Sequence, residues 1–132
     1  MAGKKAVLVI DDEPSVADAL KLILKDSGYD VVVAMTGGDA FEELGKRRFD
    51  LVIADVRLPD MSGLDVLRHL RRSHPGVFAV IITAHHTPEL AAESLSLGAV
   101  AVLPKPFSPS DLLTVIDTAF SSLLPRSFDG DR

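Results

Sequence analysis

Short apolar runs alternate along this chain with segments whose apolar residues recur at helical spacing. The runs cover residues 6–10, 31–34, 51–54, 77–82 and 100–103. Each run is too short for a helix, and its unbroken apolar character is typical of a strand that is buried on both faces. The pattern therefore predicts the strands of a parallel sheet that is covered on both sides.

A helix is predicted after each of these strands. The first begins at Pro14, places Ala19 on its apolar face and ends at Gly28. A turn at Gly37 and Gly38 precedes the second, and the remaining helices cover about 64–70, 88–97 and 112–123. The alternation predicts one α/β domain of the (βα)5 type, with a doubly wound five-stranded parallel sheet.

Polar side chains follow four of the five predicted strands. Asp11 and Asp12 follow the first strand, Asp55 the third, Thr83 the fourth and Lys105 the fifth. Right-handed crossovers place the carboxyl ends of all parallel strands at one edge of the sheet, where open α/β sheets bind their ligands. We therefore expect these side chains to converge, although they lie far apart in the sequence.

The converging residue types indicate phosphoryl chemistry. Three carboxylates at one edge repel one another, so the site must hold either a proton or a cation. A few oxygen ligands without cysteine suit Mg²⁺, which keeps several waters and shares its shell with phosphoryl groups. Lys105 and the Thr83 hydroxyl would stabilise a phosphoryl group that arrives at Asp55, and attack by Asp55 would give an acyl phosphate.

Composition and charge narrow the class of protein. The chain has 132 residues, 47% of them hydrophobic, which is the size of one domain with a substantial core. It has no cysteine, which excludes disulfides and thiolate chemistry. The net charge of −5 disfavours direct nucleic-acid binding, and Arg68, Arg71 and Arg72 fit a solvated helix face. No apolar run reaches the ~18 residues of a membrane-spanning helix, so we expect a cytoplasmic protein without a membrane partner.

The site motifs resemble those of the receiver domain of two-component response regulators, in the CheY-like superfamily. The resemblance rests on Asp11-Asp12, Asp55 with its LPDMSG loop, Thr83-Ala84 and Lys105-Pro106-Phe107. The resemblance covers about residues 5–122, and the motif sequences DVRLPDMSG, TAH and LPKPF are most similar to those of receivers of the nitrogen-regulation class. It implies the flavodoxin-like strand order 2-1-3-4-5 and a cis Lys105–Pro106 peptide bond.

The resemblance also implies a role for each site residue. Asp55 would accept a phosphoryl group from a sensor histidine kinase or a phosphotransfer protein. Asp12, Asp55 and the backbone carbonyl of Arg57 would bind Mg²⁺ directly, and Asp11 would act mainly through water. In the family, the residues that match Thr83 and Lys105 contact the phosphoryl oxygens. Such a domain catalyses only its own phosphorylation and dephosphorylation and is not an enzyme that acts on separate substrates.

The fifth predicted strand departs from the family pattern. Many receivers have an aromatic residue three positions before the lysine, and its ring turns inward on activation, whereas Val102 stands there in this chain. We therefore expect activation to pass through the Thr83 loop and the fourth helix. The face formed by the fourth helix, fifth strand and fifth helix would then contact a downstream effector, an output domain or a second copy. His85 stands two residues after Thr83, and Arg57 stands two residues after Asp55. At these two positions, family members adjust the access of water to the acyl phosphate.

Each site residue also has a purely structural interpretation. Asp11 and Asp12 are residues that commonly cap a helix, and Asp55 is a residue that commonly ends a strand in a turn. Thr83 fits the end of a strand by its branched side chain, and Lys105 fits an exposed turn. Adjacent histidines such as His85 and His86 are usually solvated when no matched carboxylate accompanies them.

Three other functions share parts of this pattern. A flavodoxin-like cofactor binder would need glycine and hydroxyl residues after the first strand, where the sequence has three acidic residues. A haloacid-dehalogenase-like phosphatase would need an Asp-x-Asp nucleophile there, which DDEPS does not match. A phosphorylation-independent interaction module with the receiver fold is the main alternative. Such a module would be expected to lack an acidic site residue, Thr83 or Lys105, and none of these is lost here, so only the changed fifth strand leaves this alternative open. We expect an N-terminal extension at 1–4, the receiver domain at 5–122 and a polar tail at 123–132.

Overall fold

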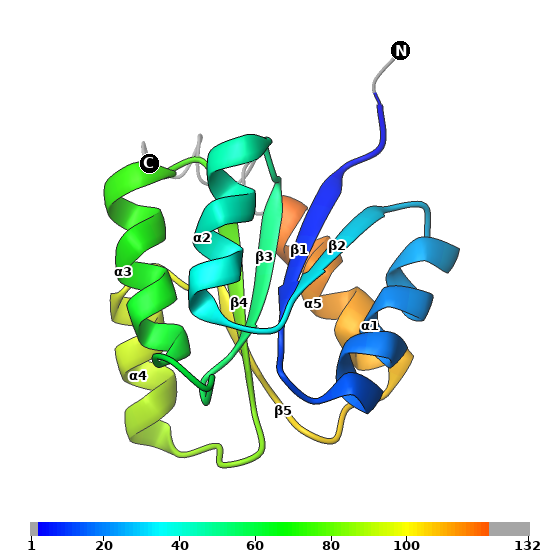
Figure 1. Ribbon diagram of the computed structural model, residues 1–132. Helices are drawn as coiled ribbons and strands as arrows, with labels where there is room; N and C mark the ends of the chain where they lie inside the picture. The colour runs from blue at the N-terminus through cyan, green and yellow to red at the C-terminus, as the bar shows by residue number, and fades with distance from the viewer. Residues whose placement is uncertain (1–2, 122–132) are drawn as a thin grey trace, which may run out of the picture.

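The computed structural model describes residues 3–121, and residues 1–2 and 122–132 lie outside the described part. Strands and helices alternate along this part of the chain (Figure 1). The strands are β1 (Ala6–Ile10), β2 (Asp30–Ala34), β3 (Leu51–Asp55), β4 (Phe78–Thr83) and β5 (Ala101–Pro104). The helices are α1 (Pro14–Asp26), α2 (Gly37–Lys46), α3 (Gly63–Ser73), α4 (Pro88–Ser96) and α5 (Pro109–Ser121).

The five strands form one parallel sheet in the order β2-β1-β3-β4-β5. This confirms the predicted fold class and strand order. The chain passes from β1 to β2 on one side and then crosses to β3 on the other side of β1. The carboxyl ends of β1 and β3 consequently lie side by side where the winding reverses, which is the usual ligand position in open α/β sheets.

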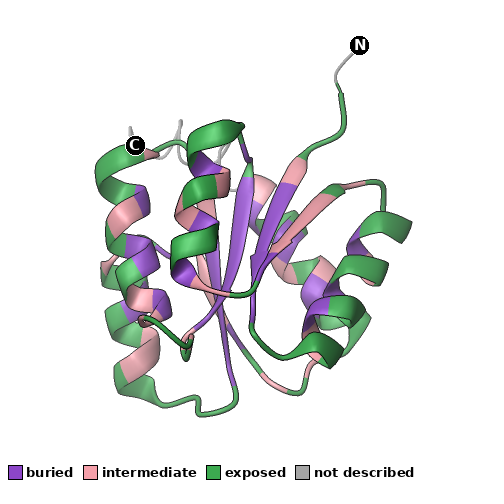
Figure 2. Cartoon of the chain, in the orientation of Figure 1, coloured by how far each residue is buried: buried purple, intermediate pink, exposed green. Residues whose placement is uncertain are grey.

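Helices cover both faces of the sheet. In Figure 1, α2, α3 and α4 lie on one side and α1 and α5 on the other. Leu8 and Ile10 of β1 belong to the apolar cluster beneath α2 and α3, whereas Val7 and Val9 belong to the cluster beneath α1 and α5. Figure 2 shows the buried strands between helices whose outer faces are exposed. Because both faces are covered, the central strands carry apolar residues at every position except Asp55 and Thr83 at the carboxyl ends of β3 and β4.

Helix α4 is the least deeply packed of the five helices. Ser94 is its only fully buried residue, and the Ser94 hydroxyl has no hydrogen-bond partner among the described residues. Leu95 on the same helix is half exposed. Few buried apolar contacts are typical of elements that move at low cost in free energy.

The start of α2 differs from the sequence-based prediction. Gly37 and Gly38 form the first turn of the helix rather than a turn that precedes it. The helix begins early because Thr36 is its N-cap, with a hydroxyl oxygen that accepts the N–H of Asp39 at 3.0 Å. Neither glycine has a positive φ, so both follow the ordinary backbone geometry of the helix.

Smaller differences concern the ends and faces of other elements. Strands β4 and β5 each begin and end one residue later than predicted. In α1, Ala19 is exposed and Ala17 is buried, because Ala17 lies one turn before Leu20 on the face that meets the sheet. Helix α5 begins at Pro109, and its predicted end at Leu123 lies outside the described residues. None of the helices within residues 3–121 has the length and apolar character needed to cross a membrane.

Candidate functional site

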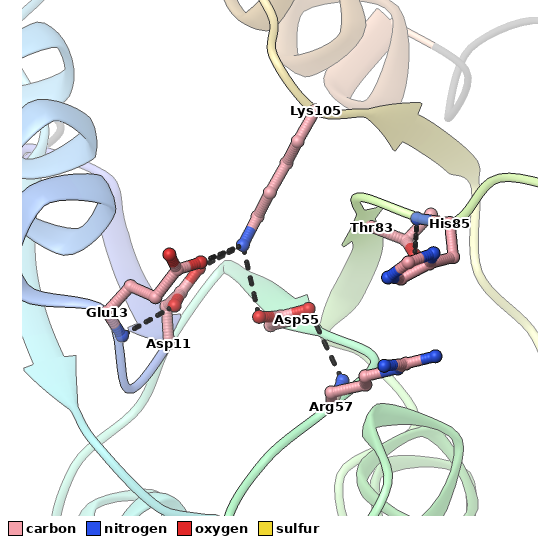
Figure 3. Close-up of polar contacts among 7 residues, drawn as sticks. All are labelled: Asp11, Glu13, Asp55, Arg57, Thr83, His85 and Lys105. Carbon is pink, nitrogen blue, oxygen red and sulfur yellow. Dashed lines mark hydrogen bonds and ion pairs between the residues drawn. The ribbon is translucent and has the colours of Figure 1, made fainter.

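Asp55 is the last residue of β3, and its side chain lies at the carboxyl edge of the sheet with 7% of the residue exposed. Parallel pairing with Ile82 of β4 sets its position in the sheet. One carboxylate oxygen, Oδ2, accepts a hydrogen bond from Lys105 Nζ at 3.1 Å. The other, Oδ1, accepts one from the Arg57 N–H at 3.3 Å (Figure 3). Two partners, one in the loop after β3 and one in the loop after β5, therefore orient this carboxylate.

Asp11, Asp12 and Asp55 form an acidic cluster whose candidate ligand atoms all lie within 4.8 Å of one another. The convergence predicted from the sequence is therefore confirmed. Asp11 is fully buried, and its Oδ1 accepts the N–H of Glu13 at 2.9 Å. Its Oδ2 accepts no well-aligned hydrogen bond from the described residues, although Lys105 Nζ lies 3.1 Å away as an ion pair. Burial raises the pKa of Asp11, against the opposing effects of the Glu13 N–H and Lys105.

Lys105 supplies the positive charge of the site. Its Nζ lies 3.1 Å from Asp11 Oδ2, 3.0 Å from Glu13 Oε1 and 3.1 Å from Asp55 Oδ2. Burial alone lowers the pKa of Lys105, but the neighbouring carboxylates of Glu13, Asp55 and Asp11 outweigh it and raise the pKa overall. The ammonium group therefore stays charged at neutral pH. The Lys105–Pro106 peptide bond is cis, as predicted.

Glu13 is a site residue that was not singled out from the sequence. It is the N-cap residue of α1, but its side chain makes no capping hydrogen bond and instead reaches Lys105. The capping interpretation of Asp11 and Asp12 is correspondingly not supported, because neither occupies the N-cap position. The available signal was a third acidic residue directly after the aspartate pair, which is ordinarily read as a charge at a helix N-terminus.

Thr83 ends β4 beside Asp55 and is almost fully buried. Its Oγ1 accepts the N–H of His85 at 3.0 Å, which leaves the hydroxyl hydrogen available to another acceptor. A cavity of about 340 Å³ opens over these groups. Its lining consists of Asp12, Glu13, Asp55, Arg57, Leu58, Pro59, Thr83, Ala84, His85 and Lys105. The predicted reactive, donor and cationic side chains thus line one cavity.

A larger cavity, of about 470 Å³, lies elsewhere on the molecule, at the amino edge of the sheet. It is lined by residues 44–50 and 74–77, and none of the predicted site residues borders it.

The loop 56–62 leads from Asp55 into α3 and folds back on itself. The Gly63 N–H donates to the Val56 carbonyl at 2.8 Å, and the Leu58 N–H donates to the Met61 carbonyl at 3.2 Å. A Cβ on Gly63 would collide with the backbone carbonyl oxygen of Asp55. Gly63 is therefore required for the close approach of α3 to β3, which agrees with its interpretation as a residue of backbone geometry.

The donor set of the acidic cluster fits a hard divalent cation. Its three side chains are carboxylates, and no thiolate or imidazole belongs to the cluster of described residues. The buried Oδ2 of Asp11 makes no hydrogen bond within residues 3–121 and has Lys105 Nζ as an ion-pair partner at 3.1 Å. Lys105 Nζ also pairs with Glu13 and Asp55, so three carboxylates share one protein cation. Oxygen-only donors favour Mg²⁺, Ca²⁺ or Mn²⁺ over zinc and copper.

Fold and site together define a doubly wound α/β domain with an aspartate, an acidic cluster and a lysine at its carboxyl edge. The model of the response regulator receiver domain family matches residues 7–117, so the chain belongs to this family. It is a receiver domain of the two-component response regulators, which are signalling modules rather than enzymes with separate substrates. Membership sets aside the flavodoxin-like cofactor binder and the haloacid-dehalogenase-like phosphatase.

Curated relatives are longer than this chain. The transcriptional regulatory protein ZraR of Escherichia coli O157:H7 is 35% identical over 115 residues, which are 87% of this chain and 26% of ZraR. The luminescence regulatory protein LuxO of Vibrio campbellii is 37% identical over 111 residues, which are 84% of this chain and 24% of LuxO. The chain thus spans about a quarter of the length of these two relatives.

Solved receiver structures match over most of both chains. A CheY-like receiver domain protein from Methanospirillum hungatei has a TM-score of 0.86 and 32% identity, and the match covers 91% of this chain and 96% of that one. The beryllofluoride-activated NtrC4 receiver domain dimer has a TM-score of 0.85 and 32% identity, with coverages of 89% and 97%.

Proposed function

We propose that Asp55 accepts a phosphoryl group from a sensor histidine kinase or a phosphotransfer protein. The observation that carries this proposal is the setting of the Asp55 carboxylate, which belongs to the acidic cluster, accepts a hydrogen bond from Lys105 and borders an open cavity. A carboxylate there is both accessible to a donor and close to the charges that a phosphoryl group requires.

In the proposed step, one carboxylate oxygen of Asp55 attacks phosphorus while the bond between phosphorus and the donor nitrogen breaks. The bonding electron pair stays on the donor imidazole, and Asp55 becomes an acyl phosphate. Lys105, which already bonds Asp55, would transfer a hydrogen bond to a phosphoryl oxygen. The Thr83 hydroxyl would donate to another, since its oxygen is oriented by the His85 N–H.

Mg²⁺ is the proposed cofactor. Asp12, Asp55 and the backbone carbonyl of Arg57 would bind it directly, and Asp11 would act mainly through water. When bound, the ion neutralises the carboxylates and the charge of the phosphoryl group. The oxygen-only donor set of the acidic cluster supports this assignment.

The side chains of Arg57 and His85 would limit the lifetime of the acyl phosphate. Arg57 and His85 line the cavity on the side away from Asp11 (Figure 3). We propose that their side chains adjust the access of water to the phosphoryl group and so the rate at which the domain dephosphorylates itself.

Output would pass through the face formed by α4, β5 and α5. Val102 is half-buried on β5 and has no ring to rotate, and α4 buries only Ser94. These features support a shift of the Thr83 loop and α4 as the switch. Downstream contacts would be made to an effector or output domain, or to a second copy. The similar beryllofluoride-activated NtrC4 receiver domain is a dimer. Residues 5–122 would form the receiver, preceded by an extension at 1–4 and followed by a tail at 123–132.

Intact-mass spectrometry tests this function directly. The protein is incubated with Mg²⁺ and acetyl phosphate, beside an Asp55→Asn control. We expect a gain of one phosphoryl mass that depends on Mg²⁺ and is absent in the control. A folded protein that gains no mass would instead support the phosphorylation-independent interaction module.

A further inference from the structure

Asp60 joins the loop after β3 to the first turn of α2. Its Oδ1 accepts the N–H of Gly37 and its Oδ2 accepts the N–H of Gly38, both at 2.9 Å. These partners lie 23 and 22 residues away in the sequence. One carboxylate therefore uses both oxygens to connect two separate elements on the face of the sheet that α2 and α3 cover.

The contact completes the N-terminus of α2. The first N–H groups of a helix have no partner within the helix. Thr36 provides an acceptor for Asp39 with its hydroxyl and for Ala40 with its carbonyl, which leaves the N–H groups of Gly37 and Gly38. Asp60 takes both, and these two N–H groups lower the pKa of its carboxyl group. The carboxylate therefore stays charged at neutral pH and remains an acceptor for both bonds.

Asp60 itself belongs to the loop 56–62, which follows Asp55 and leads into α3. Two backbone hydrogen bonds, from Leu58 to Met61 and from Gly63 to Val56, close this loop on itself. The Met61 side chain packs so closely on Gly37 that a Cβ there would collide with it. Arg57 in the same loop donates its N–H to Asp55 Oδ1. Asp60 and Met61 fix the loop tip to α2, and Leu58 and Met61 also pack against the core beneath it. Because the two backbone hydrogen bonds close the loop, a change at the Asp60 contacts can reach Arg57.

We propose that Asp60 is a positioning residue for the acidic cluster, acting through the loop rather than by contact with a bound cation. By tying the loop tip to α2, Asp60 holds the Arg57 backbone and the Asp55 carboxylate in the arrangement that a divalent cation requires. Binding of a cation to the acidic cluster should in turn alter the surroundings of the Gly37 and Gly38 N–H groups at the N-terminus of α2. This inference rests on the proposed Mg²⁺ binding, and it extends the site to a residue that touches neither the cation nor the phosphoryl group.

Amide hydrogen exchange in the metal-free protein tests the connection itself. Asp60→Asn keeps one acceptor oxygen and Asp60→Ala keeps none, so we expect exchange at Leu58 and Gly63 to accelerate more in Asp60→Ala. The matched control is Asp39→Asn, which removes an equal charge from the turn of α2 that Asp60 contacts. Within residues 3–121, no hydrogen bond or ion pair joins Asp39 to the loop. Unchanged exchange at Leu58 and Gly63 in both Asp60 variants would overturn the inference.

A Mg²⁺ titration followed by backbone amide chemical shifts tests the consequence. In the wild-type protein we expect the amide signals of Gly37 and Gly38 to shift together with that of Arg57. Loss of a supporting residue around a metal site commonly weakens binding about tenfold or more, so Asp60→Ala should bind Mg²⁺ about tenfold more weakly. Equal weakening in Asp39→Asn would assign the effect to charge alone and overturn the inference. A wild-type protein that binds no Mg²⁺ would overturn the proposed function instead, and the metal-free exchange would still decide the connection.

Discussion

Lys105 Nζ donates a hydrogen bond to Asp55 Oδ2 at 3.1 Å, although the two residues are 50 positions apart in the sequence. Their strands, β3 and β5, are not neighbours in the sheet, because β4 lies between them. The lysine side chain therefore extends across the end of β4 to reach the aspartate. The same ammonium group also contacts Asp11 and Glu13, so one cation balances several carboxylates at the site.

Replacement of this cation should impair phosphorylation strongly. Loss of one preorganised electrostatic contact in an active site slows reaction by about 10²-fold or more. We expect Lys105→Gln to slow phosphorylation of Asp55 by acetyl phosphate to that extent, as measured by the time course of the mass gain. Lys21→Gln removes the same charge from an exposed position on α1 and should react at the wild-type rate. Equal rates in both variants would show that Lys105 has no part in the reaction.

Glu13 should slow the reaction of the free domain with anionic donors. Its carboxylate lies 3.0 Å from Lys105 Nζ and competes with an incoming phosphoryl group for this cation. We expect Glu13→Gln to react a few-fold faster with acetyl phosphate, because a like charge near the acceptor is removed. The comparison is Asp18→Asn, an equal charge change at an exposed position of α1. A gain of the same size in Asp18→Asn would assign the effect to net charge.

Asp11 should make the folded domain less stable as the pH rises from acidic to neutral. Burial raises its folded pKa above the unfolded value, so the folded state binds more protons between these two values. Its contribution to stability is therefore complete below the unfolded pKa and is lost as the pH rises through the folded pKa. Without Mg²⁺, Asp11→Asn should raise the free energy of unfolding at pH 7 by about 1 kcal/mol. Urea unfolding at several pH values measures this gain, which should vanish near pH 3.

Two glycine substitutions should change stability in opposite directions. Alanine at Gly63 would place a Cβ against the carbonyl oxygen of Asp55, so Gly63→Ala should lower the free energy of unfolding by about 2 kcal/mol or more. Gly45 lies within α2 with nothing within 4 Å of its Cβ position. Gly45→Ala should therefore raise stability by about 0.5–1 kcal/mol, because alanine favours the helix. Urea unfolding of both variants is the measurement, and a neutral Gly63→Ala would contradict the close approach of α3.

Activation should alter α4 and the strand that follows it. We expect beryllofluoride with Mg²⁺ to change the backbone amide chemical shifts across residues 87–105, since only one residue of α4 is fully buried. The Asp55→Asn variant is the control. Unchanged signals in this segment of the wild-type protein, with shifts confined to the site, would rule out the Thr83 loop and α4 as the switch.

The sequence alone was sufficient for the fold and for most of the site. Unbroken apolar runs require a sheet that is covered on both faces, and parallel strands bring Asp11, Asp55, Thr83 and Lys105 to one edge whatever the packing details. Periodicity and turn residues also located each element to within a few positions. The apolar runs and turn residues can be read directly from the sequence, and the right-handed crossover is a general rule that applies to any such succession of strands and helices.

Tertiary structure alone decided which polar groups become partners. Glu13 and Asp60 are ordinary acidic residues in the sequence, and only the folded chain brings one to Lys105 and the other to the N-terminus of α2. The early start of α2 and the burial of Ala17 in place of Ala19 likewise depend on neighbouring elements. Hydrogen bonds and side-chain packing require distances of a few ångströms, and such distances between remote residues are set only when the whole domain has folded.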